Sequence, residues 1–162
     1  MTYVIPDVPL IPQAKNMACW YASAQMLIQW RQQRTQSCEA AHPDPSSDDV
    51  LVARFRANNG LALNQVTDLA QRLGLEAVPP QTPTFETFGE WLRQYGPVWF
   101  AGLHPSGHAV VITGIVDTTL MINDPWPPGK GALTRMGAER LIEVLQPLGD
   151  TNLASNFLHF PG

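Results

Sequence analysis

The hydrophobic pattern of this chain changes its period at Gly96-Pro97, and no other feature constrains the fold as strongly. Before these residues, apolar side chains recur at steps of three and four, as on an amphipathic helix. After them, short β-branched and aromatic runs are separated by Gly, Pro, Ser and Asp. Helices followed by strands are typical of an α+β fold. We therefore predict a helical half over about 1–96 that packs on an antiparallel β-sheet half over about 97–162.

The length of 162 residues corresponds to one domain, 1–162, and suffices to bury a hydrophobic core. The formal net charge of −4, with only 10 Lys and Arg residues, argues against non-specific binding to nucleic acid. No apolar run approaches the roughly 20 residues that span a bilayer, and the first residues lack the basic segment of a cleaved signal peptide. We therefore expect a monomer without nucleic-acid or membrane partners, which acts in the cytoplasm or is exported by a dedicated secretion system.

Turn and cap residues divide the pattern into elements. Ser47 and Asn64 are the expected N-caps of the second and third helices, Gly74 ends the third, and Thr84 begins the fourth. The predicted helices cover about 19–30, 48–57, 65–73, 84–95 and 134–145. The predicted strands are antiparallel and cover 97–103, 108–116, 119–123 and, at an edge of the sheet, 156–160.

Three residues from separate parts of the chain each lie at the end of an expected element: Cys19 begins a helix, His108 begins a strand and Asp124 ends one. Backbone N–H groups and the helix dipole favour a thiolate at a helix N-terminus, and a neighbouring imidazolium stabilises it further. A carboxylate then holds the imidazole in one orientation. Taken singly, each residue has an ordinary structural alternative, namely a core cysteine, a loop histidine and a turn aspartate.

The sequence around these positions resembles the papain-like cysteine proteases. The resemblance rests on three short segments: Gln13-x5-Cys19-Trp20 with Ser23-Ala24, Gly107-His108-Ala109-Val110-Val111, and Asn123-Asp124-Pro125-Trp126. Asn16 and Met17 depart from the Cys-Gly of the family pattern, so the family's local disulfide is absent. The short spacing and the Asp-Pro-Trp segment are most similar to the compact bacterial members, which are effector-type proteases and bacteriocin leader peptidases.

The resemblance implies a Cys-His-Asp triad that acts through an acyl-enzyme without a cofactor. Cys19 is then the nucleophile, His108 the general base and acid, and Asp124 the residue that orients His108. The side-chain amide of Gln13 and the backbone N–H of Cys19 form the oxyanion hole. Trp20 packs at the helix start, Trp126 shields the His108–Asp124 pair, and Trp20, Trp126 and His104 are candidate substrate contacts. The resemblance further implies a protein or peptide substrate, a secreted effector or toxin role, and an immunity or inhibitor protein as partner.

Several alternatives remain open from the sequence. The same fold serves a catalytically silent binding module, and the same triad serves a peptidoglycan amidase or an acyl transferase. A zinc site at His104 and His108 is disfavoured, because a Pro-Ser-Gly loop separates them and no third ligand stands nearby. Asn123 competes with Asp124 for the orienting role, and Cys38 is expected to be a free thiol. His42 and His159 are expected to be structural.

Overall fold

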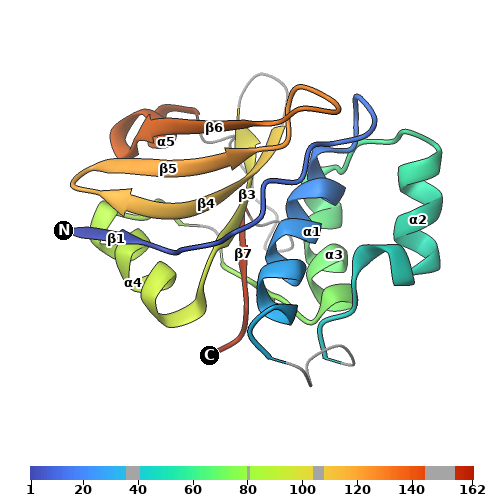
Figure 1. Ribbon diagram of the computed structural model, residues 1–162, viewed down its shortest axis with the longest axis horizontal. Helices are drawn as coiled ribbons and strands as arrows, with labels where there is room; N and C mark the ends of the chain where they lie inside the picture. Colours follow the sequence, from blue (N-terminus) through green and yellow to red (C-terminus); the bar gives the residue numbers. More distant parts are fainter. Residues whose placement is uncertain (36–40, 80, 104–107, 145–155) are drawn as a thin grey trace.

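The computed structural model describes residues 1–35, 41–79, 81–103, 108–144 and 156–162, and it consists of one antiparallel sheet with helices on both sides (Figure 1). The helices are α1 (Cys19–Gln32), α2 (Asp49–Arg56), α3 (Val66–Leu73), α4 (Phe85–Tyr95) and α5 (Ala138–Val144), with short 3-10 turns at Pro45–Ser47 and Leu63–Gln65. The strands are β1 (Thr2–Val4), β2 (Glu76–Ala77), β3 (Val98–Leu103), β4 (His108–Val116), β5 (Thr119–Asp124), β6 (Ala132–Gly137) and β7 (Phe157–His159). The predicted α+β class is confirmed.

The seven-stranded sheet has the order β2-β7-β3-β4-β5-β6, and β1 pairs with β4. Every pairing is antiparallel, as expected for the second half of the chain. β4 and β5 form a hairpin whose turn contains Asp117 in a left-handed conformation, with φ of 55°. Because the hairpin is tight, the first residue of β4 and the last residue of β5 reach the same end of the sheet.

Two predictions for the second half are wrong. Residues 134–137, expected to begin the last helix, instead belong to strand β6, and the helix covers Ala138–Val144. β6 pairs with β5, and exposure alternates along it, as is typical of a strand with one face covered. The strand expected at an edge over 156–160 is instead β7, which lies between β2 and β3. Short β1 and β2, from the first half, were not expected.

The caps show how local side chains set helix ends. Asp48, rather than Ser47, caps α2, because its Oδ1 accepts the backbone N–H groups of Val50 and Leu51. The third helix begins after Gln65 without a side-chain cap, so the expectation for Asn64 is also wrong. The hydroxyl of Thr84 does accept the N–H of Thr87 at the start of α4, and Gly74 ends α3 in a left-handed conformation.

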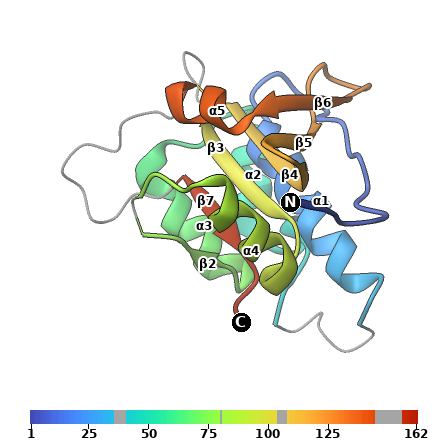
Figure 2. The same cartoon turned by 90° about the vertical axis from the view of Figure 1, so that its left-hand side faces the viewer.

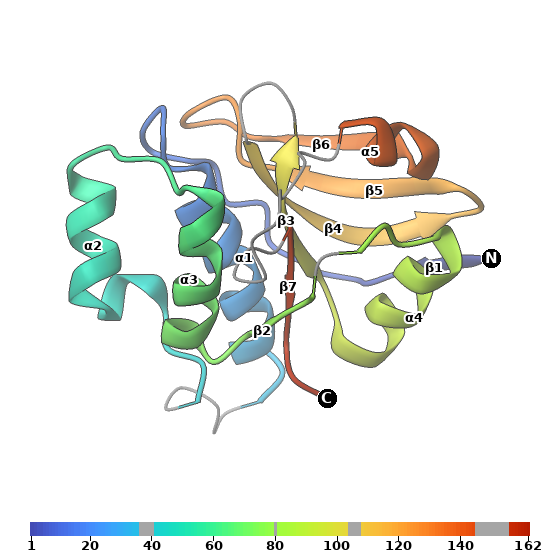
Figure 3. The same ribbon diagram turned by 180° about the vertical axis from the view of Figure 1, so that it is seen from behind.

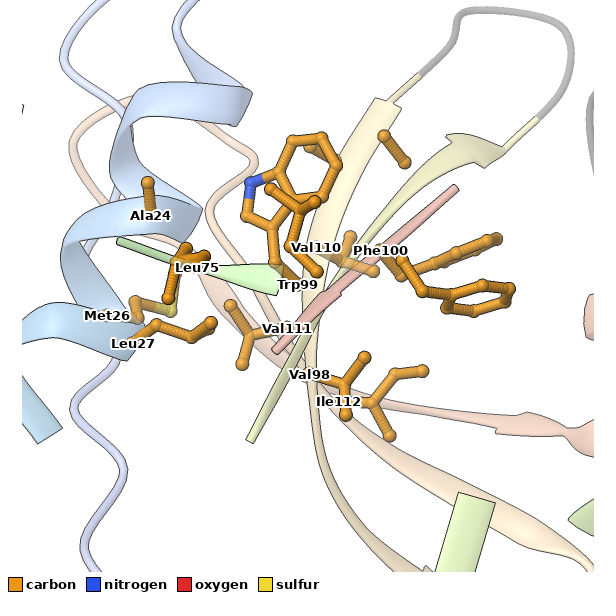
Figure 4. Close-up of a cluster of buried hydrophobic side chains, with 14 of the residues drawn as sticks. Ala24, Met26, Leu27, Leu75, Val98, Trp99, Phe100, Val110, Val111 and Ile112 are labelled. Carbon is orange, nitrogen blue, oxygen red and sulfur yellow. The ribbon is translucent and has the colours of Figure 1, made fainter. Parts of the chain in front are cut away.

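The core forms where α1 packs on the sheet. Buried side chains cover most of the circumference of α1, since Trp20, Tyr21 and Ile28 are buried as well as Met26 and Leu27. Figure 4 shows Ala24, Met26 and Leu27 of α1 facing Val111 and other side chains of the sheet. Every residue of β4 from 109 to 115 is buried, because the sheet is covered on both faces.

The other face of the sheet is covered by α4, which contacts β1, β3 and β4. Figure 2 looks onto this face, and α1 and α2 lie behind the sheet in that view.

A hydrogen bond also joins α1 to the beginning of β4. The hydroxyl of Ser23 donates to the carbonyl of Ala109 across 3.1 Å. Within the described residues, no helix has both the length and the apolarity that crossing a membrane requires.

Candidate active site

The N-terminus of α1 meets the end of the sheet at which β4 begins and β5 ends. Cys19 is the first residue of α1, His108 is the first of β4 and Asp124 is the last of β5. The antiparallel pairing of β4 with β5 brings His108 and Asp124 together, although 16 positions separate them. The packing of α1 on β4 then adds Cys19, which is partly buried. The fold therefore gathers the three residues that the sequence singled out.

His108 and Asp124 form a short hydrogen bond. The Nε2 atom of His108 lies 2.6 Å from Oδ1 of Asp124, and both side chains are about four-fifths buried, with exposed fractions of 20% and 22%. The same Oδ1 accepts the backbone N–H of Trp126 at 2.9 Å. The carboxylate is thus held by the turn that follows β5, and the imidazole is oriented with Nδ1 left for another partner.

The sulfur of Cys19 lies next to this pair. Cys19 is one of the groups that raise the pKa of His108, and the backbone N–H of Ala109, the residue after His108, donates to Cys19 Sγ at 3.4 Å. Cys19 also begins a helix, where backbone N–H groups lack partners within the helix. The sulfur therefore faces hydrogen-bond donors, which stabilise negative charge on it.

Two effects oppose each other at His108. Burial lowers the pKa of the imidazole, but the hydrogen bonds to Asp124 and Cys19 and the charges of these two groups raise it more strongly. The net result is a pKa raised from 6.5 to about 9. His108 is therefore an imidazolium at neutral pH, and it presents both a positive charge and a proton beside the sulfur.

Gln13 is buried next to the start of α1, with 1% of its surface exposed. Its side-chain Nε2 lies 2.8 Å from the carbonyl oxygen of Lys15 and 2.9 Å from that of Asn16. Its backbone N–H donates to Pro125, and its carbonyl accepts from Gly129. Gln13 thus connects the turn before Cys19 to the loop after Asp124. Donation to a substrate oxyanion requires an N–H of this amide to point away from the two carbonyls.

The remaining candidates lie in different surroundings. Trp20 is 1% exposed and its indole N–H donates to the carbonyl of Asn59. This burial contradicts the expected substrate contact and fits the packing role. The side chain of Trp126 is 48% exposed, so a large part of it faces solvent. His104 and Cys38 lie outside the described residues.

Asn123 does not compete with Asp124. Its side-chain Nδ2 donates to the carbonyls of Val8 and Pro9, at 3.2 Å each, and so it anchors the N-terminal segment rather than His108. His42 and His159 are buried, and each places Nδ1 at hydrogen-bond distance from a backbone carbonyl. In the part of the chain that the structure covers, no three His, Cys, Asp or Glu side chains gather as metal ligands would.

Two features that contact Cys19 or its neighbours were not predicted from the sequence. One is the Ala109 N–H that faces the sulfur, since a backbone donor leaves no mark on residue type. The other is the end of α2, where Asn58 and Asn59 contact the segment before and after Cys19. Asn-Asn-Gly at the end of an amphipathic helix is a recognisable helix stop, but nothing in the pattern links it to Cys19.

Comparisons with known proteins bear on the family and the fold of the chain. The family model described as "Papain-like cysteine protease AvrRpt2" matches residues 3–136. The peptidase domain of Streptococcus ComA, a bi-functional ABC transporter, has the same fold at a TM-score of 0.55 and 16% identity, over 94% of this chain and 96% of that one. A putative C39-like peptidase from Bacillus anthracis aligns at a TM-score of 0.58 and 13% identity, over 100% and 98%.

A search of the curated proteins found no match. The family match includes Cys19, His108 and Asp124 and extends over the helical half and most of the sheet. The predicted papain-like fold is confirmed by the family match, and the solved peptidase structures, at 16% and 13% identity, bear on the fold alone. The chain therefore belongs to the family of papain-like cysteine proteases.

Proposed function

We propose that the chain hydrolyses amide bonds of protein or peptide substrates with Cys19, His108 and Asp124 as its catalytic triad. The observation that carries the proposal is the position of His108, which hydrogen-bonds to Asp124 at 2.6 Å, while the N–H of the next residue, Ala109, binds Cys19 Sγ at 3.4 Å. This is the arrangement that activates a thiol nucleophile. A binding module without catalysis has no need for a buried imidazolium beside a sulfur.

In the first half of the reaction, the Cys19 thiolate attacks the carbonyl carbon of the scissile bond, and the carbonyl electron pair moves onto oxygen. When the oxyanion collapses, the carbon–nitrogen bond breaks. The proton on Nδ1 of the His108 imidazolium passes to the leaving nitrogen, so that a neutral amine departs. The products of this half are the amine and a thioester on Cys19.

In the second half, neutral His108 accepts a proton from water, and the resulting hydroxide attacks the thioester carbon. The second tetrahedral intermediate collapses with the carbon–sulfur bond breaking, which returns the thiolate of Cys19 and the imidazolium of His108. The carboxylic acid product leaves. Asp124 keeps the ring in the orientation that both proton transfers need and stabilises the imidazolium.

The oxyanion of both intermediates requires hydrogen-bond donors, and loss of one such donor in comparable enzymes costs about 10²–10³ in rate. The backbone N–H of Cys19, at the start of α1, supplies one donor. The side-chain amide of Gln13 supplies the second, after one N–H turns from the carbonyls of Lys15 and Asn16. The two backbone hydrogen bonds of Gln13 hold its main chain in place during that change.

The test is hydrolysis of casein and of a peptide library by the wild-type chain, with Cys19→Ala as the inactive variant. We expect turnover by the wild type and none by Cys19→Ala, because the alanine has no nucleophile. Full activity of Cys19→Ala would overturn the proposal. Purified peptidoglycan and a glutamine donor are assayed in parallel, since activity on either but not on protein would assign the same triad to an amidase or an acyl transferase. Slow alkylation of Cys19 near neutral pH, at the rate of free cysteine, would indicate a silent binding module.

The proposal extends to a secreted bacterial effector or toxin, neutralised in the producing cell by an immunity or inhibitor protein. It rests on the similarity of the motifs to compact bacterial members of the family. Expression in a recipient cell is the test: the wild type should arrest growth, and Cys19→Ala should not. Equal growth with both variants, at equal protein levels, would contradict the toxin role while leaving the hydrolase activity intact.

A further inference from the structure

The C-terminal end of α2 is closed by a Schellman motif centred on Asn58. The N–H of Asn58 donates to the carbonyl of Phe55, and the N–H of Asn59 donates to that of Arg54. Asn58 has a φ of 53°, in the left-handed region that this motif requires. After Gly, asparagine is the residue that adopts this conformation most readily. The backbone of this helix end is therefore well ordered by its own hydrogen bonds.

This helix end binds the segment that leads into the nucleophile. Oδ1 of Asn58 accepts the N–H of Met17 at 3.0 Å, two residues before Cys19. The carbonyl of Asn59 accepts the indole N–H of Trp20 at 3.0 Å, one residue after it. In addition, Nζ of Lys15 donates to the carbonyl of Arg56 at 3.1 Å. Figures 1 and 3 both show the end of α2 on the same side of the molecule as the beginning of α1.

Aromatic contacts reinforce the same junction. The ring of Phe55 stacks on that of Tyr21, with centroids 4.3 Å apart and an angle of 17° between the planes. The ammonium of Lys15 lies 5.4 Å from the centre of the Phe55 ring. The end of α2 is thus joined to residues on both sides of Cys19 by hydrogen bonds and by packing.

The turn before Cys19 is held from its other face by Gln13. The side chain of Gln13 binds the carbonyls of Lys15 and Asn16, whereas Asn58 binds the N–H of Met17. The N–H of Ala18 closes the turn by donating to Lys15 at 3.2 Å. The only polar side chain that meets this turn from the α2 side and accepts from its backbone, within the described residues, is Asn58.

We infer that Asn58 is a positioning residue for the nucleophile: through Met17 it fixes the turn that places Cys19 Sγ against His108 and the Cys19 N–H toward the substrate. The inference rests on the proposed hydrolase function and adds a residue to it. Asn58 combines two properties that aspartate also offers, a tolerated left-handed backbone and a short side chain with an acceptor oxygen. Glycine provides only the first of these.

The matched variants are therefore Asn58→Gly and Asn58→Asp. Asn58→Gly keeps the helix end but loses the acceptor, so its midpoint of thermal unfolding should stay close to that of the wild type. Its kcat on the best peptide substrate should fall at least about fivefold and up to on the order of 10²-fold, since a misplacement of about 1 Å has effects of that size. KM should remain within about twofold, because the residue acts through Met17. Asn58→Asp should restore kcat.

Two measurements separate this inference from the proposed function. Hydrogen exchange of the Met17 amide should be slow in the wild type and in Asn58→Asp, and fast in Asn58→Gly. Fast exchange in the wild type would overturn the inference, and this measurement does not depend on whether Asn58→Gly folds. Wild-type kcat in Asn58→Gly, equal losses in both variants, or a raised KM with unchanged kcat would also overturn it. A wild type that neither hydrolyses peptides nor alkylates rapidly at Cys19 would overturn the proposed function, and the inference with it.

Discussion

Replacing Asp124 with asparagine removes the negative charge beside His108 while keeping an oxygen in the same place. The backbone N–H of Trp126, 2.9 Å from Oδ1, would still bind that oxygen and hold it toward Nε2 of His108. The variant therefore preserves the orientation of the imidazole and changes its charge environment. It isolates the electrostatic part of what Asp124 contributes.

The size of the effect follows from the pKa of His108. The rise from 6.5 to about 9 corresponds to about 3 kcal/mol in favour of the imidazolium, since one pH unit is worth about 1.4 kcal/mol. The hydrogen bond to Asp124 is the largest of the contributions that raise this pKa, and the charge of Asp124 adds to it. We expect Asp124→Asn to lower the pKa of His108 by at least about one pH unit. Burial lowers this pKa, and the variant lacks the negative charge that raises it.

The assay is the pH dependence of kcat/KM between pH 5 and pH 10. The protonated form of His108 is the stabilised one, so activity is present below its pKa and is lost as the pH rises through about 9. At pH 8 about nine-tenths of wild-type His108 is protonated, against about half after a fall of one pH unit. At pH 6 both proteins are protonated, and a difference there measures lost orientation instead.

The control is Asp117→Asn, the same chemical change in the turn of the β4–β5 hairpin, where φ of 55° suits asparagine. This variant should keep the wild-type pH profile. The reasoning is refuted if kcat/KM of Asp124→Asn also falls at the same high pH as that of the wild type. The charge of Asp124 would then not stabilise the imidazolium.

Two further predictions concern stability in urea. Gly74→Ala should lower the free energy of unfolding by at least about 1–2 kcal/mol, because φ is 68° and a Cβ would lie 2.1 Å from the carbonyl oxygen of Ala41. The control, Gly137→Ala, should be nearly neutral, because a Cβ there meets nothing within 4 Å. Equal losses of stability in the two variants would contradict the steric argument. Ser23→Ala should lower the free energy of unfolding by about 1 kcal/mol through its lost bond to Ala109, and an unchanged midpoint would show that this bond contributes nothing.

The features that the sequence predicted well are those that depend on neighbouring residues. Thr84 caps α4 because its own hydroxyl reaches an N–H three residues later, and Gly74 ends α3 because its backbone tolerates a positive φ. The strands predicted over 108–116 and 119–123 are equally local, and their antiparallel pairing brings His108 beside Asp124. Only the motif resemblance linked these two residues to Cys19 in advance.

The features that the sequence missed depend on which partner a segment finds. Residues 134–137 were assigned to a helix by their pattern but lie along the edge of β5, where backbone pairing decides their conformation. Strand β7 fills the gap between β2 and β3, a place that no local pattern encodes.

The same distinction holds at the site. The residue types at Cys19, His108 and Asp124 were readable from the chain, because their chemistry is carried by their own side chains. The burial that insulates His108, the Ala109 N–H that faces the sulfur and the contact of Asn58 with Met17 were not. They arise only when elements about 40 to 90 positions apart pack together, and hydrogen bonds over such separations depend on the whole fold.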